Sequence, residues 1–303
     1  MDKEAHNSAP LDGVIVVDKP AGWTSHDVVN RLRRIAGTRK VGHLGTLDPL
    51  ATGVLPLVVG RATRLAQFFT GNEKIYEAVI RFGWATDTYD REGEMVGPKT
   101  EPNISRNRLD IVLDRFRGTF SQVPPPVSAK KIGGVPAYKL ARRQQPVNLA
   151  PINVIVHSLE VLDATADMVS LRVHCGAGTY LRSIAHDLGQ ILDCGAHLDS
   201  LRRTRSGDFD LEQARTLDEL AALAGEGRLS EALAPAAGLF PQFSTQIVDE
   251  VTEGRIRQGR DFAVSPFRPN REARYVKAIS HAGHLVAIGE LKLANICHPV
   301  VVM

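Results

Sequence analysis

The segment Gly42-His-Leu-Gly-Thr-Leu-Asp-Pro-Leu-Ala-Thr-Gly-Val-Leu55 decides how this chain is interpreted. It predicts a glycine-rich loop that leads directly into an apolar strand over residues 54–59. Asp48 lies inside the loop, where the flanking glycines leave its carboxylate with little screening bulk. Because loops on a rigid scaffold often carry reactive groups, Asp48 is the first candidate for a catalytic carboxylate. The alternative is that an aspartate before Pro49 only begins a turn or caps a helix.

The residues on both sides of this loop predict the strands and a helix of a sheet protein. A β-branched run over residues 13–18 predicts a buried strand, and apolar spacing predicts a helix between residues 24 and 37. Residues 75–82 alternate, so that Tyr76 points toward the covered face of its strand. A tyrosine there is most often a core residue with a satisfied hydroxyl, but its ring could instead stack on a nucleobase.

A later strand and helix carry the candidate partner of Asp48. Residues 168–175 alternate as a half-buried strand, and a glycine turn then leads into a helix. Arg182 emerges at the start of that helix, in a setting able to hold a bidentate guanidinium against a carboxylate. The alternative is a surface arginine on an amphipathic helix. The elements do not alternate regularly between strand and helix, which favours an α+β fold over a doubly wound sheet.

Two long segments and one composition change complete the predicted organisation. Residues 123–151 are rich in proline and glycine, and they predict a long insertion standing off the core. Helices are expected over residues 106–117 and within an acidic, alanine-rich stretch over residues 211–239. From about Gln246 the chain returns to short strands, and this change is the predicted domain boundary.

Composition and charge limit the possible functions. The chain has 303 residues, of which 43% are hydrophobic, and no apolar run long enough for a membrane helix; its polar N-terminus does not resemble a secretion signal. We therefore expect a soluble, cytoplasmic protein without a membrane partner. Residues 208–253 hold ten acidic residues against Arg215 and Arg228, a charge of −8, so the rest carries +11 of the total of +3. The longest acid-free stretch contains these basic residues: Arg115, Arg117, Lys130, Lys131, Lys139, Arg142 and Arg143.

This basic stretch suits a polyanionic partner such as nucleic acid, and a solvated face on an ordinary enzyme is the alternative. Metal and cofactor sites are not expected. The chain lacks the lysine and spacing of a phosphate-binding loop, and no dinucleotide fingerprint follows a strand. The three cysteines are expected to be reduced core thiols. The candidate metal ligands show none of the short spacings of zinc sites: His174, His186, His197, Cys175 and Cys194.

Four segments together resemble the tRNA pseudouridine synthase B family, which modifies uridine 55 in the T-arm of tRNA and is related to the RNA-guided dyskerin-type synthases. Residues 42–55 resemble the catalytic loop of that family. Residues 18–27 resemble its lysine–proline motif, residues 125–138 its RNA-gripping thumb insertion, and residues 178–189 its arginine motif. The four occur in the family's order, so the match is more specific than any one of them would be.

The resemblance implies an α+β pseudouridine synthase fold, with a central mixed, largely antiparallel sheet flanked by helices. Together with the composition change, it implies a flexible tail at residues 1–12 and a catalytic domain at 13–245 that contains the thumb insertion at 123–151. A small β-rich, PUA-like RNA-binding domain is expected at residues 246–303. The similarity to that domain rests mainly on residues 285–291.

By the same resemblance, Asp48 is the catalytic nucleophile and Arg182 is its ion-pair partner. Tyr76 stacks on the target uracil and is a possible base. His43 resembles the residue that fills the space vacated by the flipped base. The other substrate-binding residues that the resemblance implies are Tyr180 and Leu201 in the uracil pocket, Lys19 as a structural or RNA-contacting residue, and Lys130 and Lys131 in the thumb.

The chemistry of this isomerisation fits the residues. The reaction replaces the N-glycosidic bond of uridine by a C-glycosidic bond to the same base, and it exchanges neither electrons nor phosphate, so we expect no cofactor and no metal. The base must be flipped out of a folded arm, at a cost of a few kcal/mol that stacking on aromatic side chains helps offset. Three routes are open for Asp48: it attacks C6 of the uracil, it attacks C1′ of the sugar, or it promotes loss of the 2′ proton to give a glycal-like intermediate. By the resemblance to the family we favour the last route.

Two other functions remain open from the sequence. One is a non-catalytic RNA-binding or RNA-folding protein, which predicts no requirement for the Asp48 carboxylate. The other is a hydrolase that uses Asp48 with a histidine, for which the sequence shows no motif. The expected partner is the T-arm stem-loop of tRNA, and the expected state is a monomer.

Overall fold

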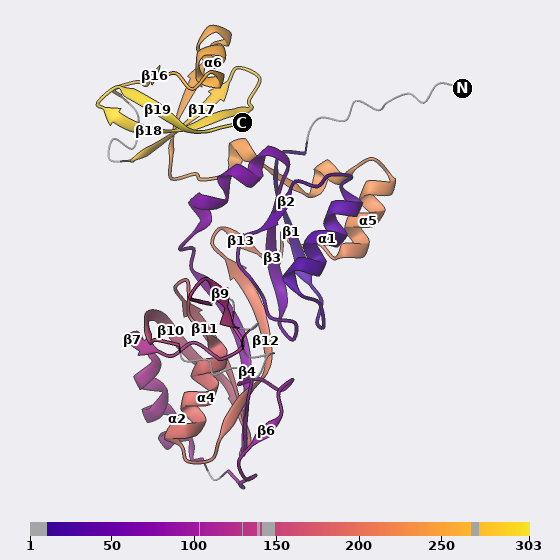
Figure 1. The fold of residues 1–303 in the computed structure, drawn as a ribbon, viewed down its shortest axis with the longest axis vertical. Helices are drawn as coiled ribbons and strands as arrows, with labels where there is room; N and C mark the ends of the chain where they lie inside the picture. Colours follow the sequence, from indigo (N-terminus) through magenta and orange to yellow (C-terminus); the bar gives the residue numbers. More distant parts are fainter. Residues whose placement is uncertain (1–10, 103, 129, 138–139, 141–148, 268–272) are drawn as a thin grey trace.

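The computed structural model describes residues 11–102, 104–128, 130–137, 140, 149–267 and 273–303. Figure 1 shows a long molecule in which a large sheet with its helices is followed by a separate small β-rich unit that carries the C-terminus. No helix in these ranges has both the length and the hydropathy needed to cross a membrane.

The large sheet has the strand order β14-β1-β3-β12-β4-β11-β10-β7, with β13 paired to β12 and β2 paired to β3. Only the β12–β3 pair is parallel, and the other pairs are antiparallel. The mixed, largely antiparallel sheet of the predicted α+β fold is thus confirmed. Its strands are β1 (Gly13–Lys19), β2 (Val41–His43), β3 (Thr52–Val59), β4 (Lys74–Phe82), β7 (Gly118–Gln122), β10 (Ile152–Ala164), β11 (Met168–Cys175), β12 (Ala196–Ser206), β13 (Phe209–Asp210) and β14 (Leu233–Pro235).

Four helices contribute to the main core with this sheet: α1 (Ser25–Ile35), α2 (Arg106–Leu113), α4 (Leu181–Ile191) and α5 (Leu217–Gly225). The helix α1 begins where the sequence predicts, because Thr24 and Asp27 form a reciprocal capping box. In β4 the alternate residues from Tyr76 to Phe82 are buried in the same core, as their spacing predicts. The side chain of Tyr76 therefore lies on the helix-covered side of the sheet.

The small unit is a five-stranded sheet in the order β15-β17-β18-β19-β16, with one helix, α6 (Glu250–Arg257). Its strands are β15 (Ser244–Val248), β16 (Phe262–Ala263), β17 (Tyr275–Ser280), β18 (Leu285–Leu293) and β19 (Ile296–Val302). This unit packs against the other side of β1 and β3: Ile279 and Leu285 share a buried cluster with Val54 and with Leu65 of the 3-10 segment η1 (Gly60–Phe69). Lys277 Nζ also donates to the carbonyl of Leu239 at 2.8 Å.

Two helix predictions are wrong in extent. The stretch 211–239 holds one α-helix, α5, followed by the 3-10 turns η3 (Leu229–Ala232) and η4 (Ala236–Gly238) and the strand β14, because Gly225 ends α5, Gly227 follows it, and Pro235 cannot continue a helix. The helix α2 ends at Leu113 and continues only as the 3-10 turn η2 (Asp114–Phe116). The predicted core thiols are confirmed, since all three cysteines are free and buried.

Parts of the insertion at residues 123–151 are described. They include a hairpin of β8 (Lys131–Ile132) and β9 (Val135–Pro136). Lys139, Arg142 and Arg143, which contribute to the predicted basic stretch, lie outside the described residues. A second hairpin, of β5 (Ala85–Thr86) and β6 (Met95–Val96), lies beyond the end of β4.

Candidate active site

The loop that carries Asp48 runs from the end of β2 to the start of β3 and is fixed at several points. The Ser25 hydroxyl accepts from the backbone N–H of Leu47 at 2.8 Å and donates to the carbonyl of Leu47 at 3.0 Å. Lys19 Nζ donates to the carbonyl of Pro49 at 3.2 Å. The residues on either side of Asp48 are thus tied to β1 and α1, so the carboxylate is presented by a braced loop.

A buried arginine that the sequence analysis missed supports the same loop. The side chain of Arg203 on β12 has no solvent exposure, and it donates to the carbonyls of Gly45 at 3.1 Å and Val54 at 2.7 Å. Gly53 has a φ of +98°, and a Cβ there would lie 2.2 Å from the backbone oxygen of Arg203. Only glycine therefore lets the loop enter β3 so close to β12.

Arg182 lies beside Asp48, with its Nε atom 3.0 Å from Asp48 Oδ2. Nε makes the nearest approach but has no hydrogen bond to any described residue, so the bidentate hydrogen bonding that the sequence suggested is absent from this pair. The other guanidinium nitrogens are held elsewhere: Nη1 donates to the carbonyl of Thr88 at 3.1 Å and Nη2 to the carbonyl of Val127 at 2.8 Å, while Asp90 Oδ2 lies 3.4 Å from Nη1. Because the side chain of Arg182 is only 5% exposed, these contacts fix its position.

Charge and burial act against each other on Asp48. Its side chain is 35% exposed, but burial of the surrounding loop raises the pKa of its carboxyl group. The positive charge of Arg182 opposes that shift, whereas the nearby carboxylate of Asp90 adds to it. Burial also lowers the pKa of Lys19 to about 8. Arg182 thus favours the ionised form of a carboxylate that its surroundings make unusually basic.

A cavity of about 280 Å³ opens at Asp48 and brings together five residues that the sequence analysis named: Asp48, Tyr76, Tyr180, Arg182 and Leu201. They come from the loop, from β4, from the start of α4 and from β12. The cavity is thus lined by two aromatic rings, an aliphatic side chain and an ion pair. This lining suits a ligand that is a planar ring with polar edges. Burial raises the pKa of the Tyr76 phenol, which disfavours the phenolate and therefore a role for Tyr76 as a base.

Other predicted residues do not line this cavity. Lys19 has no solvent exposure, and its bonds to the carbonyls of Pro20 and Pro49 favour the structural alternative over RNA contact. His43 ends β2, half-buried, with a buried Nδ1 that has no hydrogen-bond partner within the described part of the chain. Lys130 is exposed, Lys131 belongs to β8, and the side chain of Lys131 is not described.

Ser128 and Asp90 are two further residues near the ion pair that the sequence analysis did not single out. Ser128 lines the cavity from the insertion; it is 5% exposed, and its Oγ has no hydrogen bond to any described residue. The hydroxyl lies close enough to the Tyr180 phenol to lower the pKa of that group, which burial raises overall. Asp90 is buried beneath Arg182. Neither position stands out in the sequence, because a single Ser or Asp in a loop is usually a turn residue.

Comparison with known proteins gives two matching family models. The TruB family pseudouridylate synthase (N-terminal domain) matches residues 33–181, and the tRNA pseudouridylate synthase B C-terminal domain matches residues 182–239. A tRNA pseudouridine synthase B of Solibacter usitatus is 58% identical over 293 residues, which are 97% of this chain and 100% of that protein. The corresponding protein of Paenarthrobacter aurescens is 42% identical over 92% of this chain and 91% of its own length.

Solved structures agree with these matches. A crystal structure of a Cbf5–Nop10–Gar1 complex superimposes with a TM-score of 0.72 at 27% identity, covering 97% of this chain and 84% of the matched chain. A structure of an H/ACA RNP bound to a substrate RNA containing 2′-deoxyuridine gives a TM-score of 0.71 at 26% identity, covering 96% and 85%. The similarity therefore extends over both sheets of the protein.

Proposed function

This chain belongs to the TruB family of tRNA pseudouridine synthases, isomerases that convert uridine to pseudouridine in tRNA, and from that premise we propose that it modifies uridine 55 in the T-arm. The observation that carries the proposal is the contact of Arg182 with Asp48 at one cavity with Tyr76, Tyr180 and Leu201. A flipped uracil is a planar ring with polar edges, and it suits this combination of side chains.

In the proposed reaction the target uridine leaves the stack of the T-arm and enters the cavity. Tyr76 stacks on the uracil, and Tyr180 and Leu201 enclose it, so that part of the flipping cost is recovered as aromatic and apolar contact. The Ser128 hydroxyl, which has no hydrogen-bond partner among the described residues, supplies a hydrogen bond to a polar edge of the base. Such a contact ties the insertion to the bound substrate.

Asp48 then acts on the sugar. The N1–C1′ bond breaks with its electrons going to the uracil, and Asp48 takes the proton from C2′, which leaves a glycal-like sugar. The uracil turns within the cavity and its C5 bonds to C1′, while Asp48 returns the proton to C2′. Finally C5 loses its proton and N1 gains one, so atoms and charge balance. A carboxylate whose pKa is raised by burial is a better base for the first step than an exposed one.

Arg182 positions this carboxylate and keeps it ionised between turnovers. Its Nη atoms donate to the carbonyls of Thr88 and Val127, which fix the guanidinium with Nε 3.0 Å from Asp48 Oδ2. Because this contact is an ion pair without a hydrogen bond, it does not occupy the carboxylate oxygens that are proposed to react. The thumb lysines Lys130 and Lys131 and the β-rich unit from about residue 246 are proposed to hold the tRNA backbone.

The test is the incubation of an unmodified tRNA transcript with the purified protein, followed by mapping of pseudouridine along the RNA. Modification at position 55 that is abolished in Asp48→Asn and kept in Asp163→Asn, an exposed carboxylate at the far end of β10, is the expected result. Modification only at other positions would contradict the site assignment. Activity in Asp48→Asn would contradict the mechanism, and tRNA binding by the wild type without any pseudouridine formation would favour the RNA-folding alternative.

A further inference from the structure

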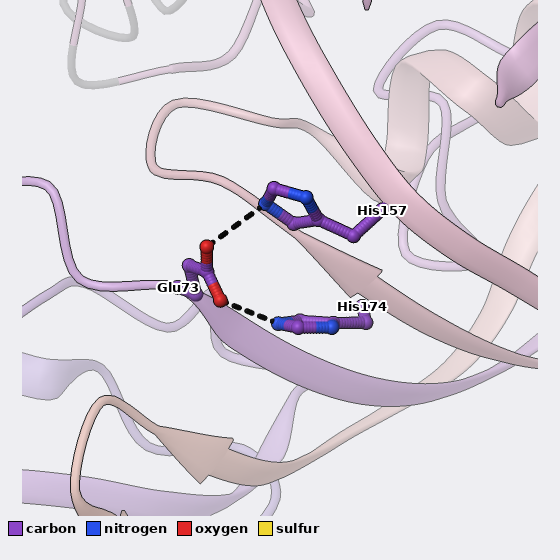
Figure 2. A group of neighbouring side chains, drawn as sticks. All are labelled: Glu73, His157 and His174. Atoms are coloured by element: carbon purple, nitrogen blue, oxygen red, sulfur yellow. Dashed lines mark hydrogen bonds and ion pairs between the residues drawn. The ribbon is translucent and has the colours of Figure 1, made fainter. Parts of the chain in front are cut away.

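A second group of side chains lies on the sheet outside the catalytic cavity, and it consists of Glu73, His157 and His174. Glu73 Oε1 is 3.0 Å from His157 Nε2, and Glu73 Oε2 is 2.8 Å from His174 Nε2. Figure 2 shows both imidazole rings pointing at the carboxylate from neighbouring strands, while Glu73 comes from the start of β4. We propose that these three residues bind a divalent first-row transition metal, with Zn²⁺ as the best-suited ion.

The strand pairing places the two histidines on one face. In the β10–β11 ladder Val156 pairs with Cys175 and Ser158 pairs with His174, so His157 is the extra residue of a β-bulge. Val156 and Cys175 are buried, so His157 and His174, which follow and precede them, both face the outer surface. The bulge places Ser158 on that surface as well and leaves His157 beside His174, with ring centroids 4.8 Å apart.

The donor atoms have the chemistry and the spacing of a zinc site. Imidazole nitrogens and a carboxylate oxygen are common Zn²⁺ ligands, with bonds of about 2.0–2.2 Å, so donors in a tetrahedral site are roughly 3.3 Å apart. The three ligand atoms lie within 4.8 Å of one another, and the two Glu73 contacts are shorter than that tetrahedral spacing. Small side-chain rotations therefore suffice to surround an ion, which would replace protons on the Nε2 atoms.

The three ligands also stand on a rigid base. The carbonyl of Glu73 accepts from the N–H of Gly207 at 2.9 Å, and both histidines belong to paired strands. Because all three side chains are partly exposed, the ion has an open path of entry, and water completes its coordination. Three protein ligands with water in the fourth position is an established arrangement for zinc in proteins.

The position of this cluster suggests what the metal does. Glu73 is followed on β4 by Lys74 and Tyr76, which line the catalytic cavity, and β11 leads from His174 to the turn before Tyr180. An ion bound here would link the residue before β4, the first half of β10 and the end of β11 behind the cavity. It takes no part in the reaction, because these ligands lie on the face of the sheet opposite to Tyr76.

The experiment measures Zn²⁺ binding to the tag-free, chelator-treated protein by calorimetry, with the visible spectrum of Co²⁺ as a second probe. We expect one ion per chain, and at least a tenfold fall in affinity, on the order of the effect of removing one ligand, in each of His157→Gln, His174→Gln and Glu73→Gln. At about 100 times its dissociation constant, Zn²⁺ should raise the thermal midpoint of the wild-type protein by roughly 5 °C and leave that of the variants unchanged.

The matched control is His298→Gln, which removes a histidine that also faces a carboxylate: its Nδ1 lies 2.7 Å from Asp261 Oδ1. This variant should bind Zn²⁺ as the wild type does. Absence of binding at one ion per chain, or equal affinity in the three cluster variants and the wild type, would overturn the proposal. Circular dichroism of every variant establishes that weaker binding does not come from unfolding. The readouts do not involve tRNA, so they are independent of the proposed function.

Discussion

Two aspartate–arginine pairs lie in the part of the molecule built around the large sheet, and their geometries differ in an instructive way. Arg202 holds Asp18 through two nitrogens, at 3.1 and 2.8 Å, and the two side chains are 40% and 30% exposed. Arg182 approaches Asp48 most closely with Nε, at 3.0 Å and without a hydrogen bond, while its Nη atoms donate to backbone carbonyls. The pair with hydrogen bonds thus has the more exposed arginine, and the arginine at the cavity holds its carboxylate by charge.

The difference indicates that the arginine beside the proposed reactive carboxylate fixes its position without forming hydrogen bonds to both of its oxygens. A bidentate contact satisfies both oxygens, and at an exposed site it contributes little to stability, about 0–1 kcal/mol. A buried arginine that is anchored elsewhere lowers the pKa of the aspartate by charge and leaves an oxygen available. Each of the following predictions compares the two pairs or extends the comparison to the rest of the cavity.

The largest effect is expected from removing the two carboxylates in turn. Asp48→Asn should lower the single-turnover rate of pseudouridine formation by at least about 10³-fold, because an amide keeps the shape but cannot accept the proton. Asp18→Asn should change the rate less than a few-fold and the thermal midpoint only slightly. Equal losses of rate in the two variants would show that the difference in geometry between the two pairs does not affect catalysis.

Replacing each arginine by lysine should again lower the rate more at the Asp48 pair than at the Asp18 pair, but by a smaller factor than Asp48→Asn does. Arg182→Lys should lower the single-turnover rate by roughly 10²-fold, because a lysine cannot keep the contacts to Thr88, Val127 and Asp48 at once. Arg202→Lys should have little effect on the rate. The affinity for tRNA should be similar in both variants; a fall in affinity alone for Arg182→Lys would make Arg182 an RNA contact.

The pH dependence should report the state of Asp48. Since burial raises its pKa and the proposed reaction needs the ionised carboxylate, the rate should be full at higher pH and fall as the pH drops through that raised pKa. Arg182 lowers the pKa, so Arg182→Leu should move this acid limb to higher pH, whereas Arg202→Leu should leave it in place. Single-turnover rates of the two variants across the acid range measure the shift. An identical limb in the wild type and Arg182→Leu would refute the electrostatic role.

A moderate effect is expected at Ser128. If its free Oγ binds the uracil, Ser128→Ala should lower kcat/KM by about 5- to 15-fold, which corresponds to one neutral hydrogen bond. Ser121→Ala is the matched control, because that serine is exposed on β7 and does not line the cavity. A rate that Ser128→Ala leaves unchanged would mean that the hydroxyl serves only to fill space.

The smallest effect concerns the outer surfaces that are proposed to hold the tRNA backbone. Neutralising Lys130 and Lys131 should reduce the slope of log affinity against log salt by roughly 0.7–0.9 for each phosphate that is no longer neutralised. Arg255→Gln with Arg260→Gln makes the same test of the β-rich unit, and both arginines are exposed. Salt titrations of tRNA binding measure the slopes, and unchanged slopes would leave these residues as a solvated face.

Truncation near Gln246 would not be a clean test of that unit. Ile279, Leu285 and Ile288 share a buried cluster with residues of β1, β3 and η1, so the cut would expose apolar surface of the large sheet. Point changes at exposed arginines leave this interface intact. Arg274, by contrast, is already paired with Glu290, and Arg268 and Arg271 lie outside the described residues.

Much of the secondary structure and the family of this protein could be predicted from local sequence. Alternation identified the buried face of β4, apolar spacing predicted a helix at α1, and four motifs in order identified the family, because periodicity and motifs are properties of neighbouring residues. The ends of α5 and α2 were predicted less accurately. The acidic, alanine-rich composition typical of a helix continues across the turns and the short strand that follow α5.

Only the tertiary structure decided how distant residues meet. It placed Arg203 beneath the Asp48 loop, brought Arg182 to within 3.0 Å of Asp48, and brought Ser128 to the wall of the cavity. It also brought Glu73, His157 and His174 together, although they lie 84 and 17 positions apart along the chain and show no metal-binding spacing. Strand pairing creates these contacts, and pairing between strands depends on the packing of the whole sheet, which no local pattern encodes.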